Sequence, residues 1–86
     1  MDDILVEIYC ETMMREYDFW LPKKGYIKDV IKKLAEEIMI FENNSNLFDS
    51  QEIEGLVLVG TNGNVFNKDY TVVESGIMGG DRLMLV

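Results

Sequence analysis

The chain has 86 residues, of which 48% are hydrophobic, and its 16 acidic and 8 basic residues give a formal net charge of −8. This length accommodates one domain, 1–86, whose core is large enough to fold without a metal or a disulfide. The acidic balance argues against binding to nucleic acid or anionic lipid, because both require basic residues to neutralise phosphate.

The sequence shows the features of a cytoplasmic protein. Cys10 is the only cysteine, so the chain cannot form an internal disulfide, which fits a reducing compartment. The chain begins with the acidic stretch Met1-Asp2-Asp3, whereas a signal peptide begins with basic residues. No apolar run is long enough to span a bilayer. We therefore expect a cytoplasmic location and no direct membrane insertion.

The first half predicts two strands followed by a helix. Apolar and polar residues alternate over Ile4–Cys10 and over Glu16–Leu21, as they do in half-buried strands. Tyr26–Phe41 has the spacing of an amphipathic helix. The predicted inward positions are Ile4, Val6, Ile8, Tyr17, Phe19 and Leu21 on the strands, and Ile27, Val30, Ile31, Leu34 and Ile38 on the helix. The polar, asparagine-rich segment 42–54 is expected to be a long loop.

The second half predicts short strands separated by turns. Leu56–Val59 is an apolar run between two glycines, and Asn62-Gly63 favours a tight turn into a brief strand at Val65-Phe66. Thr71 and Glu74 have the spacing of a capping box. The element order is therefore β-β-α-β-β-β.

The end of the sequence predicts a turn and a final strand. Gly76 is placed to end the capped turn in a left-handed conformation, and Gly79-Gly80-Asp81 forms a tight turn. Leu83 and Leu85 then alternate with Arg82, Met84 and Val86, as in a half-buried strand.

One helix packed across a mixed sheet is the α+β architecture of the β-grasp. The run Gly76-Ile77 followed by Gly80-Asp81-Arg82-Leu83 resembles the ubiquitin superfamily, and the first hairpin and helix agree in order and length. Among small bacterial proteins the chain looks most like the YukD/EsaB family, which is associated with type VII (WXG100) secretion. The resemblance implies a cytoplasmic accessory or regulatory protein that binds a secretion-system component.

Conjugation chemistry is not expected. A conjugated ubiquitin-like protein ends in a flexible tail with a free diglycine, whereas Gly79-Gly80 lies inside the predicted turn and Val86 ends the predicted last strand.

Enzymatic activity and cofactor binding are not expected either. The sequence contains no histidine, so the commonest general base and metal ligand are absent. Cys10 is in phase with the inward residues of its strand, which predicts a buried thiol rather than a nucleophile. No phosphate loop or calcium loop has the required spacing.

The outer face of the predicted sheet is the main candidate binding surface. With the β-grasp strand order 2-1-5-3-4, the outward residues fall on adjacent strands and are expected to form one apolar surface. Such surfaces usually mark interfaces. The candidate residues are Leu5, Tyr9, Trp20, Val57, Met84 and Val86. Three occupants remain open: a protein partner, a second copy of the chain forming a homodimer, or the 42–54 loop.

A second candidate surface is basic. Lysines crowd the start of the predicted helix, where the helix dipole favours anions instead. This arrangement suggests contact with an acidic surface of a partner; the alternative is a lysine run that is simply exposed to solvent. The residues are Lys23, Lys24, Lys28 and Lys32, followed by Lys33.

Overall fold

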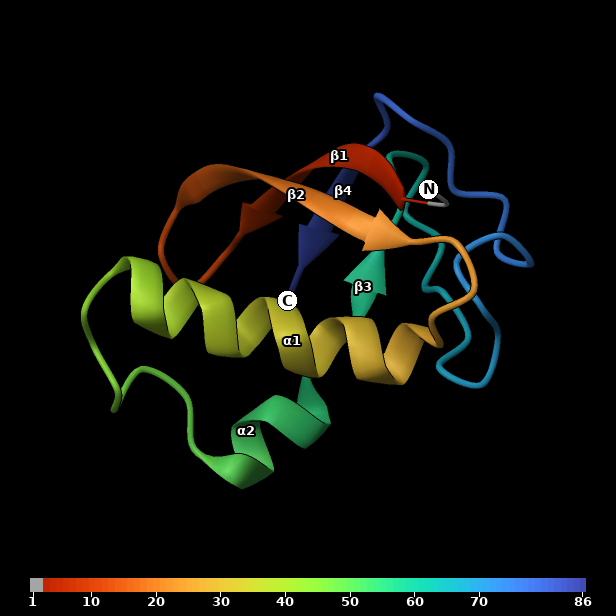
Figure 1. Ribbon diagram of the computed structural model, residues 1–86. Helices are drawn as coiled ribbons and strands as arrows, with labels where there is room; N and C mark the ends of the chain where they lie inside the picture. The colour runs from red at the N-terminus through yellow and green to blue at the C-terminus, as the bar shows by residue number, and fades with distance from the viewer. Residues whose placement is uncertain (1–2) are drawn as a thin grey trace.

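The computed structural model describes residues 3–86, so Met1 and Asp2, which the sequence assigns to the single domain, lie outside the described residues. Figure 1 shows a sheet whose inner face lies on one long helix. The elements are β1 (Asp3–Cys10), β2 (Arg15–Pro22), α1 (Ile27–Phe41), α2 (Ser50–Gly55), β3 (Leu58–Val59) and β4 (Arg82–Leu85).

The sheet is mixed and has the order β2-β1-β4-β3. β1 pairs antiparallel with β2 and parallel with β4, and β3 pairs antiparallel with β4. The first and last strands of the chain are therefore neighbours in the middle of the sheet. This arrangement confirms the α+β, ubiquitin-like β-grasp architecture expected from the sequence.

The hairpin β1–β2 follows the predicted alternation. On β1, Val6 and Ile8 are buried and Ile4 packs against the core. On β2, Tyr17, Phe19 and Leu21 are buried, and the residues between them are exposed. The period-2 pattern therefore gave the correct inner face for both strands.

Helix α1 supplies the other half of the core. Tyr26 is its N-cap but makes no side-chain capping bond, and its C-terminal end is closed by the Glu42 N–H, which bonds to the Ile38 carbonyl. The stripe facing the sheet is Ile27, Val30, Ile31, Leu34, Ala35 and Ile38. Burying each of the larger of these side chains contributes roughly 1.5–3 kcal/mol. Packing against the sheet, rather than capping, therefore stabilises this helix.

The expectation of an unstructured loop over 42–54 is wrong in its second part, because residues 50–55 form the helix α2. Asp49 and Glu52 make a reciprocal capping box: the Glu52 N–H bonds to the Asp49 carboxylate at 2.7 Å, and the Asp49 N–H bonds to the Glu52 carboxylate at 3.0 Å. Phe48 is buried just before this box. The capping pair and the Phe48 anchor order a segment whose composition is typical of loops.

The predicted strands after this helix are shorter than expected. Gly55 ends α2, and only Leu58–Val59 is assigned to a strand, although Val57 exchanges two backbone hydrogen bonds with Val86 at 2.8 and 3.0 Å. The brief strand at Val65-Phe66 is reduced to a single bridge between Val59 and Val65. The Val65 side chain is 60% exposed, so a longer ladder would bury little apolar surface there.

The C-terminal segment follows the prediction closely. The Thr71 N–H bonds to the Glu74 carboxylate at 2.9 Å, and the Glu74 N–H bonds to the Thr71 hydroxyl at 3.2 Å. Gly76 has φ +78 and Gly80 has φ +87, so both glycines occupy the left-handed region that other residues avoid. Leu83 and Leu85 are then buried on β4.

We predict that Gly76→Ala lowers the free energy of unfolding by about 1 kcal/mol, because a Cβ strains a residue with positive φ. The space around a Cβ at Gly76 is open, so the loss comes from the backbone conformation alone. Gly55→Ala is the matched control, since its surroundings are equally open and it lies in a helix. Urea unfolding measures the stability of both variants. Equal changes in the free energy of unfolding would contradict the view that positive φ at Gly76 causes the loss.

Candidate protein-binding surface

The strand register fixes which side chains share the outer face of the sheet. Leu5 lies opposite Trp20, and Tyr9 lies opposite Met84. Leu5, Trp20 and Met84 are 41%, 63% and 39% exposed, although each is large and apolar. Tyr9 is half-buried between its neighbours. The four side chains thus lie on the face turned away from α1.

The other two candidates extend this surface across β4. Val57 and Val86 form a hydrogen-bonded backbone pair, and Val59 lies opposite Met84. All three valines are half-buried. Val59 was not among the sequence candidates, although the alternation through Val57 would have placed it on the same face. Tyr9, Met84 and the three valines therefore form one group, which we call the Met84 cluster.

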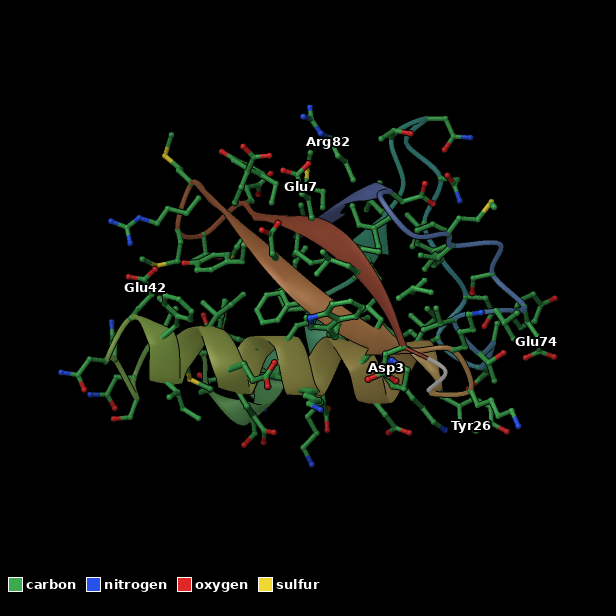
Figure 2. All side chains as sticks on the ribbon, turned by 45° about the horizontal axis from the view of Figure 1, so that its top comes forward. Asp3, Glu7, Tyr26, Glu42, Glu74 and Arg82 are labelled. Atoms are coloured by element: carbon green, nitrogen blue, oxygen red, sulfur yellow. The ribbon has the colours of Figure 1, made fainter. Side chains whose placement is uncertain are left out.

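The expectation of one continuous apolar surface is wrong. Glu7 lies between Leu5 and Tyr9 on the same face, opposite Asp18 on β2 and Arg82 on β4. Arg82 Nε and Glu7 Oε2 are 2.8 Å apart, and Figure 2 shows both side chains rising from the sheet away from α1. Asp18, Glu7 and Arg82 thus form a row across the sheet, which we call the polar band. It separates the Leu5–Trp20 pair from the Met84 cluster.

The polar band limits which partners fit the outer face of the sheet. The Glu7–Arg82 pair is largely exposed, so its contribution to stability is small, about 0–1 kcal/mol. Asp18 has no counter-charge of its own among the hydrogen bonds and ion pairs of residues 3–86. A partner of this face must therefore supply polar groups at its centre and apolar groups on both sides.

The 42–54 segment does not cover this face, so that alternative is wrong. Helix α2 contacts α1, and Figure 1 shows it on the side of α1 away from β1 and β2. Its Ile53 packs against the core from that side and lines a groove with Ile31 of α1. The outer sheet face is left open to a partner or to a second copy of the chain.

The lysines at the start of α1 do not form a single cluster. Lys28 and Lys32 line the groove beside α2, together with Lys68. Lys33 lines a different groove, beside Trp20 of β2. Lys23 and Lys24 lie in the turn before the helix.

Some of this basic charge is already engaged. Lys28 Nζ lies 3.9 Å from an Asp69 carboxylate oxygen and 5.8 Å from the centroid of the Tyr26 ring. Lys68 donates to the Glu54 carbonyl at 2.8 Å. The helix start therefore offers less free charge than the sequence suggests.

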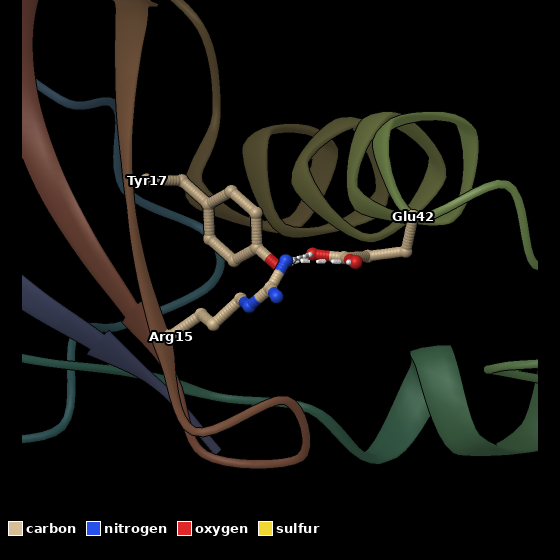
Figure 3. Close-up of polar contacts among 3 residues, drawn as sticks. All are labelled: Arg15, Tyr17 and Glu42. Carbon is tan, nitrogen blue, oxygen red and sulfur yellow. Dashed lines mark hydrogen bonds and ion pairs between the residues drawn. The ribbon is translucent and has the colours of Figure 1, made fainter.

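A polar contact that the sequence did not indicate joins β2 to the end of α1. The Tyr17 hydroxyl donates to the Glu42 carboxylate, and Arg15 Nη1 lies 3.1 Å from the same carboxylate (Figure 3). The Phe41 ring packs edge-on against Tyr17, with 5.9 Å between centroids. Because these residues are far apart in the sequence, no local pattern could have revealed the contact.

The contact shifts the pKa of both titratable partners. Burial, followed by the hydrogen bond to Glu42 and its negative charge, raises the pKa of Tyr17 to about 12. The hydrogen bond from Tyr17, assisted by Arg15, lowers the pKa of Glu42. The contact therefore holds a neutral phenol against an ionised carboxylate.

The surroundings of Cys10 and of the acidic side chains can be described directly. Cys10 is 1% exposed, so reagents have no access to its thiol in the folded protein. Across residues 3–86, no three acidic, cysteine or histidine side chains gather as metal ligands would. In the same range, none of the helices has the length and apolar character required to cross a membrane.

No protein-family model matches the sequence, and no curated protein matches it. Solved structures do. The ubiquitin-like domain of the type VII secretion protein EccD1 from Mycobacterium tuberculosis superposes with a TM-score of 0.71 at 17% identity, covering 100% of this chain and 99% of that one. The EccD5 ubiquitin-like domain from Mycobacterium xenopi gives 0.76 at 16% identity, with 100% and 94% coverage. The chain has the ubiquitin-like fold.

The same fold occurs outside secretion systems and inside larger chains. The ubiquitin-like domain of Dsk2 from Plasmodium falciparum gives a TM-score of 0.72 at 17% identity, covering 98% of this chain and 96% of that one. A protomer of the ESX-3 core complex gives 0.71 at 18% identity, but this chain spans only 16% of that protomer. At these identities the likeness establishes the fold alone.

We predict that Glu42→Gln lowers the pKa of Tyr17 from about 12 toward the ordinary value of 10.0. A phenol with a raised folded-state pKa adds stability below pH 10, and this contribution is lost as the pH rises to about 12. Alkaline unfolding of wild type and Tyr17→Phe, followed with an ultraviolet titration of the phenols, measures it. If the Tyr17 phenol titrates at the same pH in wild type and in Glu42→Gln, the assignment is contradicted.

The Glu42 carboxylate of the same contact makes stability depend on pH in the opposite direction: its contribution is lost as the pH falls. Because the pKa of Glu42 is lowered in the folded state, its contribution is present above the ordinary value of 4.5 and is lost as the pH falls below it. Glu42→Gln is therefore expected to flatten the loss of stability in acid, as measured by urea unfolding between pH 3 and pH 6. An unchanged slope would contradict the prediction.

Proposed function

We propose that this protein is a cytoplasmic ubiquitin-like binding module, an accessory or regulatory component of a type VII secretion system. Its partner is a protein of that system, and the docking site is the outer face of the sheet. The observation that carries the proposal is the exposure of Leu5, Trp20 and Met84 on one face of a fold shared with EccD ubiquitin-like domains. Large exposed apolar side chains on a sheet face are typical of interfaces.

The resemblance to the YukD/EsaB family and the likeness to EccD domains support the same assignment from different sides. The first rests on residues, chiefly the Gly80-Asp81-Arg82-Leu83 approach to the last strand. The second rests on the superposition of the whole chain. A domain with the fold of the EccD ubiquitin-like domains is suited to dock onto, or compete with, such a domain in the secretion apparatus.

We further propose that the protein acts by binding alone, without catalysis, cofactor or conjugation. The Cys10 thiol is buried, and Gly79-Gly80 is the only pair of adjacent glycines in the sequence. The Gly80 N–H donates to the Leu5 carbonyl at 2.8 Å, so this pair is part of the fold. Cleavage after Gly80 would separate β4 from the sheet.

The alternative occupant of the outer face is a second copy of the chain, which gives a homodimer without a direct secretion role. The polar band weighs against it, because two copies packed face to face about the centre of the band bring the two Glu7 carboxylates together. Like charges directly opposite each other destabilise a contact. A heterologous partner with basic central residues avoids this repulsion.

We predict that Met84→Asp weakens capture of a type VII secretion component from native lysate by at least about tenfold, because the charge is placed inside the Met84 cluster. Captured proteins are identified by mass spectrometry. Ile40→Asp is the matched control, since Ile40 is 78% exposed on α1, away from the sheet face. Both variants are first checked for folding by circular dichroism.

The outcomes separate the two occupants. Loss with Met84→Asp but not with Ile40→Asp supports docking on the outer face. Equal capture by wild type and Met84→Asp contradicts it. Sedimentation over a concentration series tests the homodimer: a wild-type dimer that Met84→Asp dissociates would assign the face to self-association.

A further inference from the structure

Strand β2 forms one edge of the sheet, and its free backbone groups can be identified. On β1, the Glu7 N–H bonds to the Asp81 carbonyl, and the Leu5 carbonyl accepts from Gly80, so the odd-numbered residues face β4. The even-numbered residues of β1 therefore bond to β2, where their partners are Arg15, Tyr17, Phe19 and Leu21. The N–H and C=O groups of Glu16, Asp18 and Trp20 consequently point away from the sheet.

Nothing within residues 3–86 pairs with these groups. None of the backbone or side-chain hydrogen bonds outside the regular ladders and helices involves the main chain of Glu16, Asp18 or Trp20. Figure 1 shows β2 as the outermost strand, running beside α1 without another segment along its free edge. An extended peptide can add to such an edge as one more strand.

A groove runs along the inner side of this edge, between β2 and α1. Its floor is apolar, and its lining comes from the C-terminal end of β2, the following turn and one side of α1. The lining residues are Trp20, Leu21, Pro22, Gly25, Val30 and Leu34, with Asp29, Lys33 and Glu37 at the helix. The Tyr17–Glu42 contact closes the other end of the space between β2 and α1. The groove therefore admits side chains only near Leu21.

The edge is acidic. Glu16 and Asp18 project from β2 on the outer face, and Asp29 and Glu37 line the groove on the helix side. Among residues 3–86, Lys33 is the only cation lining the groove, and Arg15 is already paired with Glu42. The whole chain carries a net charge of −8. A complementary strand therefore needs basic residues.

A second copy of the chain does not provide such a strand. Pairing two β2 edges antiparallel about their middle places Asp18 opposite Asp18, and one neighbouring register places Glu16 opposite Asp18; both set like charges in direct opposition. The other neighbouring register places Glu16 opposite Pro22, which has no N–H for the ladder. Charged edge residues and a proline at the strand end, here Pro22, are also common protection against edge-to-edge association.

We propose that the β2 edge binds an extended segment of another protein by strand addition, and that this segment alternates basic and apolar residues. Side chains opposite Glu16 and Asp18 lie on the outer face and are basic. The alternate side chains of the segment point toward α1, and the one nearest Leu21 enters the groove. This site is separate from the Met84 cluster, although Trp20 lies both on the outer sheet face and at the groove.

Hydrogen exchange measured by NMR tests the proposal, with the synthetic peptide acetyl-Lys-Val-Arg-Val-Lys-Val-Arg-amide as the probe. In the free protein, the amides of Glu16, Asp18 and Trp20 are expected to exchange rapidly, because they bond only to water. With saturating peptide their exchange slows at least about tenfold, while Tyr17 and Phe19, already bonded to β1, change little. The same peptide with glutamate in place of lysine and arginine produces no slowing.

Two variants separate the backbone contribution from the charge contribution. Asp18→Asn keeps the outward N–H and removes the charge, so binding is expected to weaken about fivefold and to lose part of its salt dependence. Asp18→Pro removes the outward N–H without removing a bond to β1, so binding is expected to be lost. Circular dichroism and the amide spectrum establish that each variant is folded.

Several outcomes would overturn the proposal: no slowing at the three outward amides, equal slowing by the acidic peptide, or full binding by a folded Asp18→Pro variant. If Asp18→Pro does not fold, the exchange pattern of the wild type and the binding of Asp18→Asn decide the question. Met84→Asp is expected to bind the peptide as wild type does. Loss of lysate capture and loss of peptide binding are therefore independent results.

Discussion

The parallel pairing of β1 with β4 is the constraint on which the rest of the structure depends. It joins the first and last strands of the chain and buries Leu83 and Leu85 against α1. It also aligns Glu7 with Arg82 and Tyr9 with Met84, so both the polar band and the Met84 cluster are built across this one junction. A one-residue slip would exchange the buried and exposed sets of β4. The candidate surface therefore exists only in the folded chain.

Side-chain alternation and turn chemistry predicted most of the fold. Local rules were sufficient for the inner faces of β1 and β2 and for the buried stripe of α1. They were also sufficient for the turns at Gly76 and Gly80. The errors lie where a local signal was overlooked or where tertiary packing decides. Helix α2 was overlooked, although Asp49 and Glu52 have capping-box spacing. The shortness of the ladder after β3 follows from packing that no local pattern encodes.

The candidate surface was predicted less completely than the fold. The outward residues lie on the expected face, but continuity depends on which residues fall between them, and Glu7, Asp18 and Arg82 occupy that position. Strand order and alternation would have placed all three there, had the polar residues been followed as closely as the apolar ones. The Tyr17–Glu42 contact and the groove beside Leu21 arise from the approach of β2 to α1, which no sequence spacing specifies. Contacts that follow from strand order and alternation were therefore predictable, and contacts that depend on how a strand approaches a helix were not.

The central claim is that the open face of the sheet, and not the helix side, is the surface through which this protein acts. Methyl NMR of the protein mixed with its captured partner measures this most directly. The account predicts that the Met84, Val57 and Val86 methyl signals shift or broaden while Ile40, exposed on α1, stays unchanged. A response at Ile40 with the Met84 cluster unaffected would contradict it.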